Sequence, residues 1–92
     1  MDYKILPYSF QQADKLGVTI KPSKKKDKKI DVFKNNKLVT SIGAKNYKDF
    51  PTYTKEKGKE FADERRRLYK LRHKKDASVV GSAGYYADKI LW

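Results

Sequence analysis

The sequence predicts an α+β fold in which a β-hairpin, or a sheet of three short strands, packs against a long basic helix and a short C-terminal helix. Three observations favour this class: two β-rich runs that flank a pair of asparagines, a long amphipathic pattern of helical period, and a serine before the last helical segment. A chain of 92 residues forms a small unit with a thin core, so we expect residues 1–92 to be a single domain.

The N-terminal segment, residues 1–8, is expected to be an extended arm that a proline ends. Ser9 can then cap a short helix, because a serine hydroxyl accepts a hydrogen bond from a free N–H of the first helical turn. That helix is expected to end at Leu16, since Gly17 readily adopts the left-handed conformation that closes a helix.

The middle of the chain predicts strands. Residues 18–20 alternate as a short strand, and the lysine-rich run 24–29 is expected to be a loop. Residues 30–42 then form a hairpin, because Asn35 and Asn36 tolerate the positive φ that a type I′ turn requires.

Three helices are expected in the remainder of the chain. Asp49 is the expected cap of a short helix over 49–58. A long helix follows over 59–75, with acids near its beginning and basic residues near its end, as the helix dipole prefers. Ser82 is the expected cap of the last helix, over 83–91. The apolar stripe of the long helix consists of Phe61, Ala62, Leu68, Tyr69 and Leu71.

Basic charge is concentrated in the middle of the chain. The sequence has 23 lysines and arginines against 11 acids, a formal net charge of +12, and residues 24–75 alone carry +12. Such a region attracts polyanions, either nucleic acid or acidic protein surfaces. Because most of the cations are lysines, which bind phosphate as point charges, nucleic-acid binding would show little sequence preference. The alternative is that the lysines serve solubility alone.

The residue types that catalysis and metal binding need are scarce. Cysteine is absent, which excludes disulfides and fits a reducing, intracellular compartment, and no apolar run approaches the roughly 20 residues of a membrane span. His73 is the one histidine, and no glycine-rich phosphate loop is present. We therefore predict a binding protein that is no enzyme, with no catalytic residues, no metal site and no cofactor. Residues 81–84 match the GxxG clamp of one RNA-binding module, but a tight turn between helices is favoured.

The predicted polyanion surface combines the lysine-rich loop with the basic face of the long helix. If the fold brings both to one side, several phosphates are neutralised together and binding depends strongly on salt. The alternative is an ordinary solvated helix face. The residues predicted to bind polyanions are Lys24, Lys25, Lys26, Lys28, Lys29, Arg66, Arg67, Lys70, His73 and Lys74.

Arg65 and Arg72 project from the middle of the apolar stripe of the long helix. A half-buried cation needs an anionic partner, so we expect these arginines to form structural ion pairs, above all with Asp76 and Asp88. The other available anions are Asp31 and the carboxylate of Trp92. The pairs would hold the last helix against the long one. The alternative is that both arginines face a partner subunit.

Apolar residues near both ends of the chain are candidates for docking onto a partner protein. Each side chain of the closing Ile90-Leu91-Trp92 gains about 1.5–3 kcal/mol from burial, so this end is expected to be covered. The residues predicted to dock are Tyr3, Ile5, Leu6 and Trp92.

Several segments of the chain together resemble a known family. The segments are Asp63 to Asp76 with its Arg-His-Lys-Lys string, Gly81 to Asp88, the closing Ile90-Leu91-Trp92, Ile20 to Ser23, Ile42 to Ala44, and Asp49 to Tyr53. On these residues the sequence resembles, over about residues 15–92, a family of small basic proteins of unassigned function. That family is encoded by large double-stranded DNA viruses of eukaryotes, algal viruses included.

The resemblance implies a viral protein packaged in the virion, inside or within the capsid shell. The predicted function is therefore structural: a minor capsid-associated component that cements capsid proteins, with its basic patch toward acidic surfaces or the genome. The alternative is a dedicated sequence-nonspecific nucleic-acid-binding protein. Viral capsid proteins are the predicted partners and nucleic acid is the second, while self-association is left open.

Overall fold

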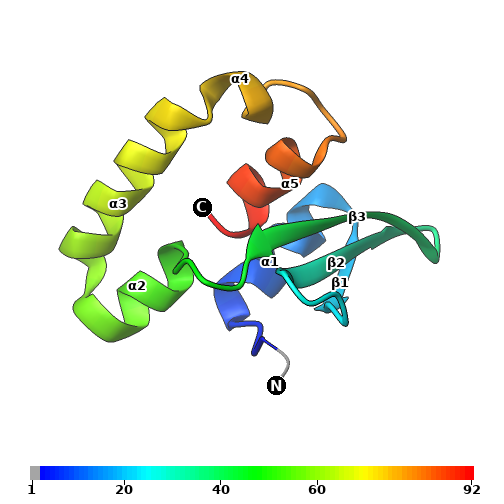
Figure 1. The fold of residues 1–92 in the computed structure, drawn as a ribbon, viewed down its shortest axis with the longest axis horizontal. Helices are drawn as coiled ribbons and strands as arrows, with labels where there is room; N and C mark the ends of the chain where they lie inside the picture. The colour runs from blue at the N-terminus through cyan, green and yellow to red at the C-terminus, as the bar shows by residue number, and fades with distance from the viewer. Residues whose placement is uncertain (1–2) are drawn as a thin grey trace.

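A computed structural model describes residues 3–92 as five helices around one sheet (Figure 1). The α+β class is confirmed, and the described residues form one compact unit. In chain order the elements are α1 (Pro7–Leu16), β1 (Thr19–Pro22), β2 (Lys28–Lys34), β3 (Lys37–Ala44), α2 (Phe50–Lys57), α3 (Lys59–Arg72), α4 (Lys74–Ala77) and α5 (Ala83–Ile90).

The sheet is antiparallel, with the strand order β1-β2-β3. Asn35 and Asn36 form the turn between β2 and β3 with φ of 54° and 65°, the left-handed conformation that a type I′ turn needs. The predicted hairpin is thus confirmed. β1 pairs with β2 along its whole length, with Ile20 opposite Val32, so the sheet has the third short strand as well.

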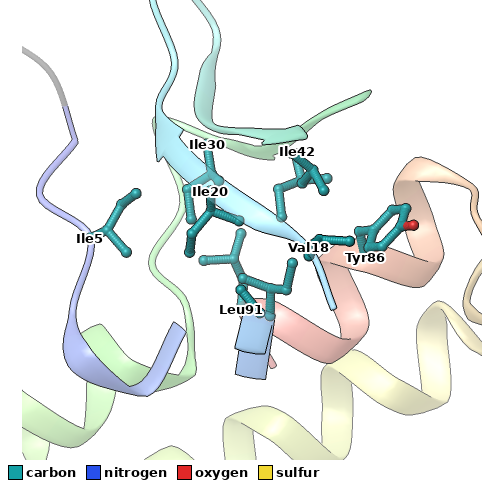
Figure 2. Close-up of a cluster of buried hydrophobic side chains, with 10 residues drawn as sticks. Ile5, Val18, Ile20, Ile30, Ile42, Tyr86 and Leu91 are labelled. Carbon is teal, nitrogen blue, oxygen red and sulfur yellow. The ribbon is translucent and has the colours of Figure 1, made fainter. Parts of the chain in front are cut away.

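The core lies where α1 and α5 cover the sheet. Ile30, Val32 and Ile42 of the sheet are fully buried, and Ile90 and Leu91 meet them from the end of the chain. Figure 2 shows Ile30, Ile42 and Leu91 within this cluster of buried side chains. Because each large aliphatic side chain contributes about 1.5–3 kcal/mol on burial, this layer is the main source of stability.

The N-terminal segment differs from the predicted arm 1–8. α1 begins at Pro7, inside that range, because proline is favoured in the first turn of a helix. Ser9 is therefore not the cap, and its buried hydroxyl donates a 2.9 Å hydrogen bond to the backbone carbonyl of Ile90. The first part of the arm, residues 1–2, lies outside the described residues.

Three predicted helix boundaries are confirmed. Gly17 closes α1 with a left-handed φ of 72°. The Asp49 carboxylate accepts a 3.0 Å hydrogen bond from the Thr52 N–H and so caps α2. The Ser82 hydroxyl accepts a 3.2 Å hydrogen bond from the Tyr85 N–H and caps α5.

The predicted long helix is divided in two. α3 ends at Arg72, and a break at His73 separates it from the short α4. α4 packs against α5 where Gly84 leaves room, because a Cβ on that glycine would lie 2.9 Å from the carbonyl oxygen of Asp76. Tertiary packing thus overrides the continuous helical pattern. Residues 78–82 connect α4 to α5, so only the first two residues of the segment 81–84 lie in the interhelical turn, and the last two belong to α5.

α3 packs mainly on α2 and α4 rather than on the sheet. Figure 1 shows α2, α3 and α4 as an arc around the C-terminal end of the chain. On α3 only Ala62 is fully buried, whereas Phe61 and Leu71 of the predicted apolar stripe are 45% and 63% exposed. The prediction that Phe61 and Leu71 belong to a buried apolar stripe is therefore wrong, because the arc of α2, α3 and α4 does not pack on the core.

Candidate functional site

The prediction that Lys29 lies in a polyanion-binding loop is wrong. β2 begins at Lys28, so the loop is shorter than 24–29, and Lys29 belongs to the strand, where its side chain is buried against the segment that follows β3. The Lys29 side chain is 5% exposed, and its Nζ lies 2.9 Å from Oδ2 of the buried Asp49. It also donates to the carbonyl of Tyr47. Lys29 is therefore structural, with its charge matched inside the fold.

The other lysines of this run stay at the surface. Lys24, Lys25, Lys26 and Lys28 are exposed around the turn between β1 and β2. A backbone hydrogen bond of 3.2 Å from the Lys45 N–H to the Asp27 carbonyl ties this turn to the segment after β3. The turn thus presents a group of exposed lysines on a fixed backbone.

The predicted basic face of α3 is partly neutralised by acids of the same helix. Arg66 lies 3.3 Å from Asp63, and its guanidinium lies 3.7 Å from the centroid of the Phe50 ring. Arg67 lies 2.6 Å from Glu64, and its hydrogen bond holds the pKa of that carboxyl below its usual range. These cations already have partners when a ligand arrives.

His73 and Lys74 lie at the break between α3 and α4. His73 stacks on Tyr69 with ring centroids 4.3 Å apart, and its Nδ1 lies 3.5 Å from a carboxylate oxygen of Asp76. Lys74 is exposed. Since α4 packs on α5, these residues and the lysine turn between β1 and β2 belong to different parts of the fold.

The predicted ion pairs of Arg65 and Arg72 are wrong. Within residues 3–92 neither guanidinium forms an ion pair: Arg65 lies 5.5 Å from the centroid of the Tyr53 ring, and Arg72 is exposed. Lys70 instead reaches the nearly buried Asp88 at 3.0 Å. A lysine therefore holds α5 against α3, and the two arginines are left without a carboxylate partner.

The residues predicted to dock onto a partner are engaged within the chain. Ile5 is buried in the core, so the prediction is wrong for Ile5. Tyr3 donates a 2.7 Å hydrogen bond to Asp49, and burial raises the pKa of its hydroxyl. Leu6 is half-buried before α1, and the half-buried Trp92 stacks on a tyrosine of α3. Residues near both ends thus contribute to the fold itself.

A cavity of about 610 Å³ opens between α3 and the sheet. Its walls come from the end of β3, the segment 45–49, the arc of α2 and α3, and the end of α5. This volume is within the range of small-molecule sites, and the cavity brings together residues that are far apart in the sequence.

Aromatic rings form one side of the cavity. Trp92 stacks on Tyr69 with centroids 4.3 Å apart and planes 7° apart, and the Tyr53 ring lies 6.2 Å from Trp92. Tyr47 also lines the cavity and is 74% exposed. Burial raises the pKa of Tyr69, so its hydroxyl stays neutral at physiological pH. The wall is thus a set of uncharged rings.

The cavity has a positive charge. Arg65 and Arg72 line it, together with Lys29 and Lys48, which pair with Asp49 and Glu56. Asp49 is the one side-chain carboxylate among its described lining residues, and it is already shared between a lysine, a tyrosine hydroxyl and a backbone N–H. The lining therefore favours an anionic ligand over a cationic one.

Other kinds of site find no support in the described residues. In residues 3–92 no group of three or more His, Cys, Asp or Glu side chains is placed to hold a metal ion. Over the same range, every helix is too short or too polar to cross a membrane. Comparisons with protein-family models, with curated proteins and with solved structures gave no match. The function is therefore argued from the side chains themselves.

Proposed function

We propose that the protein binds nucleic acid without sequence preference, through the lysines that surround its sheet. The distribution of charge carries this proposal. Residues 21–49 contain ten lysines and three aspartates, a net charge of +7. Within this set, Lys29 and Asp49 neutralise each other inside the fold, so the remaining charge belongs mainly to surface lysines.

The helical arc contributes less to this charge. Residues 50–77 contain ten cations and five acids, a net charge of +5. Several of these acids pair with cations of the same helix, as Glu64 does with Arg67. A phosphate that binds such a cation competes with the carboxylate, so the gain in free energy is smaller. We therefore propose that nucleic acid binds mainly to the surface of the sheet rather than to the predicted basic face of α3.

The exposed lysines lie at both ends of the sheet. Lys25, Lys26 and Lys28 surround the turn before β2, whereas Lys34 and Lys37 face each other across the hairpin end. Like charges directly opposite each other destabilise a hairpin, and a bound polyanion relieves that repulsion. Since a residue of a strand spans about 3.3 Å, the two groups lie roughly 20 Å apart and can contact separate phosphates.

The virion setting that the resemblance implies agrees with this function, because a packaged genome is a dense polyanion. We place nucleic acid before capsid proteins as the partner for one reason. The cementing role depended on free apolar residues near the chain ends, and Ile5 and Trp92 pack within the chain.

Fluorescence anisotropy of a short labelled duplex, titrated at low and at physiological salt, tests the proposal. We expect dissociation constants of about 10⁻⁴ to 10⁻⁶ M at physiological salt, with a steep salt dependence and no preference among duplex sequences. Binding that disappears at physiological salt would contradict it.

Two triple variants with equal loss of charge locate the surface. The sheet variant should weaken binding and reduce the slope of log K against log salt by up to about 3, one for each phosphate contact. The arc variant should change both quantities less, and equal losses would contradict the assignment to the sheet. The sheet variant is Lys25→Gln, Lys26→Gln, Lys28→Gln, and the arc variant is Lys55→Gln, Lys57→Gln, Arg67→Gln.

A further inference from the structure

We propose that the cavity between α3 and the sheet binds one nucleotide, with its base against the aromatic wall and its phosphate at Arg65 and Arg72. This site goes beyond the duplex binding proposed above. It uses the side chains that line the cavity, and none of the exposed lysines at the two ends of the sheet lines it.

The size and the rings of the cavity suit a nucleobase. Its volume of about 610 Å³ lies within the range of about 300–1,000 Å³ that small organic ligands occupy. Tyr53, Tyr69 and Trp92 form a continuous group of rings at the wall, and Tyr47 lies exposed at its edge. Tyr69 already stacks with both Trp92 and His73, so a base would stack on the ring faces of the wall that remain uncovered. Every base has a flat π face for such stacking, so this wall favours a planar ligand.

Arg65 and Arg72 supply the groups that bind the anion. They lie seven residues apart, and Tyr69 lies between them at helical spacing, so all three share one face of α3. Neither arginine has a carboxylate partner in the described chain, in contrast to Arg66 and Arg67 on the same helix. A guanidinium without a carboxylate partner can bind phosphate in a bidentate manner.

The chemistry of the lining excludes the simpler classes of ligand. A cation would find Asp49 as the one side-chain carboxylate of the described lining, and that carboxylate already accepts three hydrogen bonds. A neutral apolar molecule would desolvate the two guanidinium groups without offering them an acceptor. A molecule that has both a flat ring and an anionic group can contact the aromatic wall and the two guanidinium groups at the same time.

A free nucleotide and an unpaired nucleotide of a single strand share this chemistry. Trp92 is the one tryptophan of the chain, so its fluorescence reports on the cavity directly. The protein is titrated with adenosine monophosphate and with a short single-stranded oligonucleotide. Adenosine, inorganic phosphate and a duplex serve as the comparison ligands.

We expect the nucleotide to quench the Trp92 fluorescence in a saturable manner. Adenosine and phosphate should bind at least about tenfold more weakly, because adenosine lacks the anionic group and phosphate lacks the flat ring. Equal affinity for phosphate and nucleotide would overturn the proposal, as would the absence of saturable quenching by both the mononucleotide and the single strand. Quenching by the single strand alone supports an unpaired nucleotide of a single strand as the ligand of the cavity. Quenching by both the single strand and the mononucleotide supports a free nucleotide as the ligand.

Arg65→Gln and Arg72→Gln are each expected to weaken nucleotide binding about tenfold, since each removes a charge-assisted hydrogen bond. Because neither arginine forms an ion pair, both variants should keep the wild-type melting temperature within a few degrees. Arg67→Gln is the matched control on the same helix, and an equal loss in that variant would overturn the proposal. Duplex anisotropy should stay unchanged in Arg65→Gln and Arg72→Gln, so the failure of either proposal is recognised separately.

Discussion

Lys29 Nζ and Asp49 Oδ2 lie 2.9 Å apart, with side chains that are 5% and 1% exposed. The pair joins the sheet to the beginning of α2, across 20 residues of sequence. The same carboxylate caps α2 at Thr52 and accepts from Tyr3. One acidic side chain therefore fixes the N-terminal segment, the sheet and the helical arc relative to one another.

Removal of the lysine from this pair should destabilise the fold strongly. Lys29→Met is expected to lower the free energy of unfolding by about 3 kcal/mol, because Asp49 would stay buried without its counter-charge. Urea denaturation measures the change. Lys28→Met is the matched control on an exposed neighbour, with an expected change below about 0.5 kcal/mol. Similar losses in the two variants would show that the buried pair contributes little.

Gly43 is required both for its backbone conformation and for its lack of a side chain. Its φ is +79°, and an added Cβ would lie 2.7 Å from Cδ1 of Leu91 and 3.0 Å from Cδ of Lys29. Gly43→Ala should therefore cost about 1 kcal/mol of backbone strain and about 1–3 kcal/mol of overpacking.

Gly17→Ala is the comparison that separates these two costs. Gly17 has a φ of +72° with nothing within 4 Å of an added Cβ, so only the strain of about 1 kcal/mol is expected. The difference between the two alanine variants in urea denaturation gives the overpacking cost at Gly43, and equal losses would contradict the tight contact with Leu91.

Stability should fall at alkaline pH in a way that depends on Tyr3. Burial and the charge of Asp49 raise the pKa of the Tyr3 hydroxyl above its ordinary value of 10.0. A group with a raised pKa in the folded state stabilises the fold fully below its unfolded pKa, and this contribution is lost as the pH rises through the folded pKa. We therefore expect the wild-type free energy of unfolding to decrease above about pH 10.

Tyr3→Phe isolates this effect. At neutral pH the variant is expected to be about 1 kcal/mol less stable, because it lacks the hydrogen bond to Asp49. The gap should narrow above about pH 10, where the wild type loses the contribution of Tyr3. Tyr47→Phe, on an exposed ring, controls for the loss of a hydroxyl. A constant gap from neutral to alkaline pH would disagree with the raised pKa of Tyr3.

The turn of the hairpin can be improved at Asn36. This residue has a φ of 65°, which glycine adopts at no steric cost. Asn36→Gly is expected to stabilise the fold by about 0.5 kcal/mol, and Asn36→Ala to destabilise it by about 1 kcal/mol. Thermal melts of both variants check the opposite signs, and a stabilising alanine would exclude the left-handed turn.

Boundaries that depend on neighbouring residues could be predicted from the sequence. Gly17, Asp49 and Ser82 end or begin helices through hydrogen bonds to groups within a few residues. Asn35 and Asn36 form the hairpin turn for the same reason, since their positive φ is a property of the local backbone. The α+β class followed from these signals together with the periodicity of the segments between them.

Roles that depend on distant partners could not be predicted in this way. Lys29 belongs to a run of lysines that looks uniform in sequence, and its partner lies 20 residues away. Ser9 resembles a helix cap, but its partner is the carbonyl of Ile90 across 81 residues. For Lys29 the local pattern predicted a surface role and for Ser9 a helix cap, and in both cases the tertiary contact placed the side chain inside.

The cavity has one signal in the sequence, and the helical pattern alone leads to a wrong prediction from it. Arg65 and Arg72 interrupt the apolar stripe of the long helix, a pattern that predicts ion pairs with the last helix. Their position indicates instead that this face of α3 is no part of the core. The distance between α3 and the sheet depends on the Gly58 and His73 junctions, whose angles no local pattern specifies.

The hydrogen bond between Ser9 and Ile90 also constrains the order in which the chain folds. The β2–β3 hairpin joins residues that are close in sequence, so it can form early, whereas the contact of α1 with α5 closes a loop of 81 residues. During synthesis, the apolar face of the sheet therefore stays open until α5 has left the ribosome. Ile30, Val32 and Ile42 are exposed for that whole interval, and the emergence of α5 decides when this part of the nascent chain stops being prone to aggregation.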